Sequence, residues 1–117
     1  MFSIHIKLLS VRVQVYYGSK DWPAFKHDSI HSGHTIDDEM GPDTKLSHNG
    51  LCSGSLIWNE HPDDAITWMH EALHATQNIL SHIGITDNEM EAHIQDFIVG
   101  EIVRKLKARN IILRFRT

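Results

Sequence analysis

The chain has 117 residues, of which 41% are hydrophobic, and its formal net charge is −4. These values indicate one globular domain over residues 1–117, with enough apolar content for one core and too little length for two. The single cysteine, Cys52, excludes an intrachain disulfide framework, and we find no signal-peptide pattern and no apolar run as long as a membrane span. We therefore expect a cytoplasmic protein without a membrane partner.

Charge is distributed unevenly along the chain. Residues 104–117 hold six of the eleven Lys and Arg and no acid, whereas residues 1–103 hold all fifteen acids. Cations near the C-terminus of a helix interact favourably with its dipole, and we interpret Arg104, Lys105, Lys107 and Arg109 in this way. Contact with nucleic acid or another anionic partner is the alternative, and we do not expect a nucleic-acid partner.

Two stretches of alternating polarity open the chain. The apolar members are Phe2, Ile4, Ile6 and Leu8 in the first stretch and Val11, Val13 and Val15 in the second. Alternation predicts strands with one buried face, and the change of phase at Leu9-Ser10 favours a tight hairpin over a bulge. His5 should then face water.

The next segment carries weaker signals. Residues 21–27 predict a helix with Pro23 in its first turn, which would pack Trp22 and Phe25 against the sheet. The polar stretch 28–47 is long for a loop, and long loops in compact domains are often functional, so we expect it to line a cleft. A second metal site formed by His27, His31 and His34 is an alternative, but we interpret these side chains as solvated loop histidines.

Asn49-Gly50 predicts a hairpin turn that places Thr44–His48 opposite a strand over Leu51–Trp58. The segment 50–54 also has the G-x-nucleophile-x-G pattern with Cys52 at its centre. Because we expect a strand to follow, and not the helix that such an elbow requires, we assign Cys52 a packing role. The closing segment Ile111–Phe115 predicts a last strand at a sheet edge.

Residues 64–83 predict a helix that begins after Asp63 or Asp64 and ends at Gly84. Its expected apolar stripe, spaced by three or four residues, is Ile66, Met69, Leu73, Leu80 and Ile83. This helix carries the H-E-x-x-H motif. Residues four apart share a helix face, so His70 and His74 can direct two imidazole nitrogens at one zinc ion. Glu71 can reach a zinc-bound water as a general base.

A catalytic zinc usually has a third protein ligand, which must come from elsewhere in the chain. Thr86–Glu89 fits a capping box, followed by a long helix from about Asp87 to Arg109. On this helix Glu91 lies within about 60° of the stripe Ile94, Ile98 and Ile102. Burying a carboxylate is costly unless a cation meets it, so we predict that Glu91 is the third ligand.

Other interpretations of the second helix stay open. Glu91 could occupy an exposed first turn, where it would favour the positive end of the helix dipole. Asp87, Glu89 and His93 are competing ligands, although Glu89 is better explained by the capping box.

The motif 70–74, followed by Glu91-Ala92-His93 and Phe97, resembles the Glu-zincins, in which a glutamate on the next helix completes the site. More narrowly, it resembles the short zinc peptidase-like proteins encoded by bacteriophages and is similar to the protease domain of the ImmA/IrrE group, over about residues 51–106. The resemblance implies a zincin fold, zinc held by His70, His74 and Glu91, and peptide-bond hydrolysis with Glu71 as base. It also implies that the strand at 56–58 presents its edge to a peptide, unless it is an ordinary core strand.

We therefore expect a minimal zincin-like α+β fold, with a small, mostly antiparallel sheet of three to five strands, two principal helices and zinc between the helices. The expected function is a zinc metallopeptidase acting on a peptide or protein, in the host cytoplasm if a phage encodes it. A zinc-stabilised phage accessory or binding protein without peptidase activity is the alternative, and hydrolysis of a non-peptide amide is a third. Candidates for oxyanion stabilisation are His93, Tyr16, Tyr17 and the loop histidines.

Overall fold

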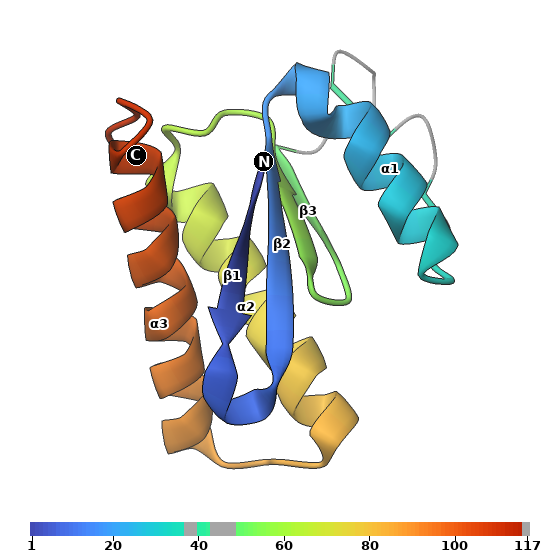
Figure 1. The fold of residues 1–117 in the computed structure, drawn as a ribbon, viewed down its shortest axis with the longest axis vertical. Coiled ribbons are helices and arrows are strands. Elements are labelled where there is room, and N and C mark those ends of the chain that lie inside the picture. Colours follow the sequence, from blue (N-terminus) through green and yellow to red (C-terminus); the bar gives the residue numbers. More distant parts are fainter. Residues whose placement is uncertain (37–39, 43–48, 116–117) are drawn as a thin grey trace.

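The computed structural model describes residues 1–36, 40–42 and 49–115, and its fold is α+β, with a mixed four-stranded sheet and three helices (Figure 1). The strands, in their spatial order, are β1 (Phe2–Ile6), β2 (Val11–Tyr17), β4 (Leu56–Asn59) and β3 (Gly50–Ser53). Strands β2 and β4 run parallel, while the β1–β2 and β3–β4 pairs are antiparallel. The predicted α+β class and small sheet are therefore confirmed for the described residues, while the sheet is mixed and a third helix joins the two that we expected.

The helices cover the two faces of this sheet. They are α1 (Trp22–His31), α2 (Ala65–Ile83) and α3 (Asn88–Lys107). In Figure 1, α2 crosses behind the sheet and α3 runs beside β1, whereas α1 stands apart from both, on the side of β2 and β3. The main core lies between the sheet and the α2–α3 pair, and a smaller aromatic core lies under α1.

The N-terminal hairpin forms as predicted, with a more elaborate loop. Lys7–Leu9 make one 3₁₀ turn, and Ser10 follows with a left-handed φ of 54°, which produces the change of phase between the strands. Leu8 is 80% exposed because it belongs to this turn and not to β1. His5 faces water, as expected.

Helix α1 confirms the predicted packing and extends beyond the predicted range. Pro23 lies in its first turn, and Phe25 is fully buried against Tyr16 and Trp58. Trp22 joins the same aromatic cluster, with its ring centroid 4.8 Å from that of Trp58. Because the helix continues to residue 31, it includes part of the stretch that we expected to be loop.

The predicted single strand over 51–58 is wrong. The chain reverses at Gly54-Ser55, where Gly54 has a φ of 60°, and Ser53 pairs with Leu56 across this two-residue turn. Such turns require positive φ at their first central residue, which glycine adopts without strain. Strand β4 consequently has neighbours on both sides, and β3, not residues 56–58, forms the edge of the described sheet. The expected partner strand Thr44–His48 and much of the proposed cleft loop lie outside the described residues.

Helix α2 begins and ends where predicted. The Asp64 side chain caps it by accepting from the Thr67 amide, and Gly84 ends it with a φ of 78°. The predicted apolar stripe is only partly correct, since Ile66, Met69 and Ile83 are exposed. The buried stripe is Ala65, Trp68, Ala72, Ala75 and Ile79. Alanines let the helix lie close to the sheet, and a count of large apolar residues overlooks them.

Helix α3 starts one residue later than expected. Asp87, and not Thr86, is its N-cap, because the Asp87 carboxylate accepts from the amides of Glu89 and Met90. The predicted capping box is therefore wrong. The apolar stripe is confirmed, with Ile94, Ile98, Ile102 and Leu106 buried.

The C-terminal segment differs from the prediction of an edge strand. Its bridge to the rest of the chain is formed by Arg114, whose backbone bonds to Asp63 and to Ala65 at the start of α2. Two of the preceding cations donate to backbone carbonyls. Arg109 donates to the Lys105 carbonyl in the last turn of α3, and Lys105 donates to the Ser3 carbonyl of β1. Within the described residues, no helix combines the length and apolar character needed to cross a membrane.

Candidate metal centre

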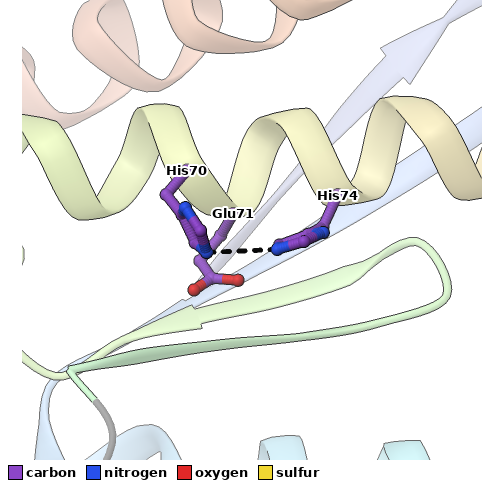
Figure 2. A group of neighbouring side chains, drawn as sticks. All are labelled: His70, Glu71 and His74. Atoms are coloured by element: carbon purple, nitrogen blue, oxygen red, sulfur yellow. Dashed lines mark hydrogen bonds between the residues drawn. The ribbon is translucent and has the colours of Figure 1, made fainter.

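His70, Glu71 and His74 converge beside α2 on the side that faces the β3–β4 hairpin (Figure 2). Each offers one ligand atom, and these atoms all lie within 4.8 Å of one another. Across the described residues this is the one group of three or more His, Cys, Asp and Glu side chains with such spacing. His27, His31 and His34 do not form a comparable group, although the rings of His27 and His31 stack on α1.

The two imidazoles are arranged as ligands of one ion would be. Their Nε2 atoms lie 3.1 Å apart, and both side chains are exposed. Two nitrogens bound at zinc–nitrogen distances of about 2.0–2.1 Å in tetrahedral geometry would stand about 3.3 Å apart. The separation of the two Nε2 atoms is therefore close to the one expected for two ligands of a single zinc ion. Without a metal, the same spacing allows one imidazole to donate to the other.

Glu71 lies on the sheet side of the histidines and is only 5% exposed. Burial raises the pKa of its carboxyl group, while the positive charge of His70, when protonated, acts in the opposite direction. Strand β3 approaches it closely: a Cβ atom at Gly50 would stand 3.0 Å from Glu71 Oε2 and 2.6 Å from Thr67 Cγ2. The absence of a side chain at residue 50 leaves room for both the Glu71 carboxylate and the Thr67 methyl group.

A cavity of about 390 Å³ opens in front of the three side chains. Its other walls are Gly50, Leu51 and Cys52 of β3 and Asn78 of α2. Asn78 donates to the Gly54 carbonyl over 3.0 Å and thereby ties the β3–β4 turn to the helix that carries the histidines. The site is thus a helix face opposed by a sheet edge, with room for a small group between them.

Cys52 lines this cavity but lacks the properties of a nucleophile. Burial, reinforced by the nearby charge of Glu71, raises the pKa of its thiol to about 12, so it is protonated at neutral pH. A strand follows it, as expected, and not the helix of a nucleophile elbow.

Glu91, the predicted third ligand, is half-buried on the first turn of α3 and lies outside the group of three. Its Oε1 accepts a hydrogen bond of 3.2 Å from Gln77 Nε2 on α2. Its role as a ligand therefore stays a prediction. Among its competitors, Asp87 caps α3, while Glu89 and His93 are exposed and likewise lie outside the group.

The tyrosines that we considered for oxyanion stabilisation lie elsewhere. Tyr16 is buried under α1, where its hydroxyl donates to Asp28, and Tyr17 packs on Phe2. Neither lines the cavity.

Three residues around the centre escaped sequence reasoning. Gln77 follows His70 by two helical turns, a spacing that already placed it on the same face. Asn78 follows His74 by four residues, and this spacing also indicates a shared helix face. The role of Gly50 depends on how closely β3 approaches α2, which sequence spacing does not contain.

Comparison with known proteins returned no match for this chain among family models, curated proteins or solved structures.

Proposed function

We propose that the protein is a zinc-dependent hydrolase, most specifically a metallopeptidase of the Glu-zincin type. The observation that carries the proposal is the convergence of His70, Glu71 and His74, whose ligand atoms lie within 4.8 Å of one another beside a cavity. In the proposed site, His70 and His74 supply two ligands and Glu91 supplies the third, and the metal retains an open position.

The metal and Glu71 have separate chemical roles in the proposed reaction. A zinc ion in such a site acts as a Lewis acid, which promotes ionisation of water and polarises a carbonyl group. Glu71 accepts the proton of the attacking water and later donates it to the leaving amine. Its raised pKa favours proton uptake, and its burial beside Gly50 holds the carboxylate in one place.

The edge strand β3 supports a peptide as the substrate. It forms one wall of the cavity, directly opposite Glu71, and it lies at the edge of the described sheet. An extended peptide can add to such an edge through main-chain hydrogen bonds, which would place a scissile bond near the catalytic carboxylate.

The substitution Glu71→Gln tests catalysis separately from metal binding. The zinc content and thermal stability should match those of the wild type, while cleavage of a mixture of unstructured peptides, followed by mass spectrometry, should fall at least 100-fold because no general base remains. Equal cleavage by both proteins would contradict the proposal. Peptides incubated with the His74→Ala variant control for contaminating proteases.

A second candidate function is that of a zinc-stabilised binding protein without peptidase activity. It is favoured by an apolar groove of about 340 Å³ between α2, α3 and the C-terminal segment, where Met69, Val103 and Phe115 are all more than 40% exposed. Exposed apolar patches of this kind often contact other proteins. A pure binding function would survive Glu71→Gln, whereas hydrolysis would not.

A further inference from the structure

A single side-chain hydrogen bond connects the histidine helix to the predicted third ligand. Gln77 on α2 donates from Nε2 to Oε1 of Glu91 on α3, over 3.2 Å. Glu91 therefore has a hydrogen-bond partner on the helix that carries the two histidines.

Gln77 occupies the position on α2 from which a ligand from α3 can be oriented. It follows His70 by seven residues and His74 by three, so all three side chains leave the helix on one face. A carboxylate bonded to Gln77 therefore stands next to this helix face, although Glu91 lies outside the group formed by His70, Glu71 and His74. Across the described residues, Oε2 of Glu91 accepts no hydrogen bond, so this oxygen is available to a metal while Oε1 is occupied.

We infer that Gln77 is a positioning residue, which orients the Glu91 carboxylate toward a zinc ion held by His70 and His74. The inference rests on the proposed zinc site and adds a residue that does not itself bind metal. Ligating carboxylates are commonly hydrogen-bonded by a neighbour, and loss of that neighbour typically weakens metal binding roughly 10- to 100-fold.

The chain contains a matched control for this contact. Gln95 on α3 also donates across the same helix pair, from Nε2 to the Met69 carbonyl over 3.3 Å. It has the same side chain, although Gln95 is half-buried and Gln77 is exposed, and its acceptor is a backbone carbonyl and not a predicted ligand. Gln95→Met therefore measures what the loss of an interhelical amide bond does to the fold alone.

The test is the zinc dissociation constant of the full chain, measured by competition with a chromophoric chelator. We expect Gln77→Met to raise it roughly 10- to 100-fold and Gln95→Met to change it less than about threefold. Methionine preserves the length of the side chain and removes the donor. Thermal unfolding of both metal-free variants should be alike, which shows that the helices still pack.

A double-mutant cycle identifies the route of the effect. In a Glu91→Ala background, Gln77→Met should weaken zinc binding no further, because the carboxylate that it orients is gone. An equal loss in both backgrounds would overturn the inference, as would an unchanged constant for Gln77→Met alone. The visible spectrum of the Co²⁺-substituted protein should change in the same way for Gln77→Met and Glu91→Ala, and an unchanged spectrum for Gln77→Met would count against the inference.

Failure of the underlying site would be recognised separately. If Glu91→Ala leaves the zinc dissociation constant unchanged while His74→Ala raises it, the third ligand is misassigned, and the role of Gln77 falls with it. If Glu91→Ala weakens zinc binding but Gln77→Met does not, the proposed site stands and only the positioning role is lost.

Discussion

Glycine at position 50 leaves room beside β3 for the Glu71 carboxylate and the Thr67 methyl group. Any Cβ atom there would meet the Thr67 methyl group, the Glu71 carboxylate and the Trp58 carbonyl, all at 3.0 Å or less. We expect Gly50→Ala to cost about 1 to 3 kcal/mol of stability, since the Trp58 carbonyl is a backbone group that cannot move without disturbing the β3–β4 pairing. It should also displace Glu71 and reduce hydrolysis more than it reduces zinc binding.

Thermal unfolding and zinc titration of the Gly50→Ala protein check this expectation. Gly100→Ala serves as the control, because nothing lies within 4 Å of its new Cβ and the residue is inside α3. Alanine there should stabilise the protein by up to about 1 kcal/mol through helix propensity. A Gly50→Ala protein as stable and active as the wild type would show that β3 does not press on Glu71.

The Tyr16–Asp28 hydrogen bond makes a pH-dependent contribution on the opposite face of the sheet. The Tyr16 hydroxyl, followed by His27, holds the pKa of the Asp28 carboxyl group below its ordinary value. A carboxyl group whose pKa is lower in the folded state stabilises the fold at pH values above its unfolded-state pKa. This stabilisation is lost as the pH falls through the folded-state pKa. Because the Asp28 side chain is 45% exposed, the stability at stake is small.

The direct measurement is therefore an NMR titration of the Asp28 carboxyl group. In Tyr16→Phe its pKa should rise toward the ordinary aspartate value, because the principal hydrogen-bond donor is gone. The difference in stability between wild type and variant should then narrow as the solution is acidified. An unchanged Asp28 titration would show that the bond does not form in solution.

At the scale of elements, the start of α2 fixes the orientation of the motif. Asp64 caps the helix by accepting from the Thr67 amide and, over 2.7 Å, from the Thr67 hydroxyl. His70 lies less than two turns further on, so fraying from this end would reach the first of the proposed ligands. We expect Asp64→Ala to cost about 1 kcal/mol and to weaken zinc binding measurably.

Asp64→Asn is the informative comparison for this cap, because asparagine keeps an acceptor oxygen for the Thr67 amide. It should retain most of the stability in denaturant unfolding. Equal losses for alanine and asparagine would indicate that the charge of Asp64, and not capping, is what matters.

The elements also show which sequence signals are reliable. The caps Asp64 and Gly84 and the isoleucine stripe of α3 were predictable, because each follows from local backbone chemistry. The turn at Gly54-Ser55 was not, because the apolar residues on either side of it fit a single strand over Leu51–Trp58. The turn at Gly54-Ser55 allows Leu56–Asn59 to pair with β2, and that pairing is a tertiary event.

At the scale of the whole molecule, the order of the strands creates the site. Strand β4 pairs in parallel with β2, so the hairpin partner β3 is placed outside it, against the exposed side of α2. The histidine helix could be predicted from one motif of five residues. The position of β3 against this helix, with Gly50 and Cys52 in the cavity wall, could not be predicted from the sequence. It depends on a parallel pairing between segments more than 40 residues apart.

The central claim is that this chain holds one zinc ion through His70, His74 and Glu91. The most direct measurement is the zinc content per chain of the purified wild type, His74→Ala and Glu91→Ala proteins after mild chelation. We predict one zinc per chain for the wild type and strongly reduced content in both variants. Wild type that binds no zinc even after the metal is added would contradict the account, and undiminished zinc in Glu91→Ala would remove the third ligand from it.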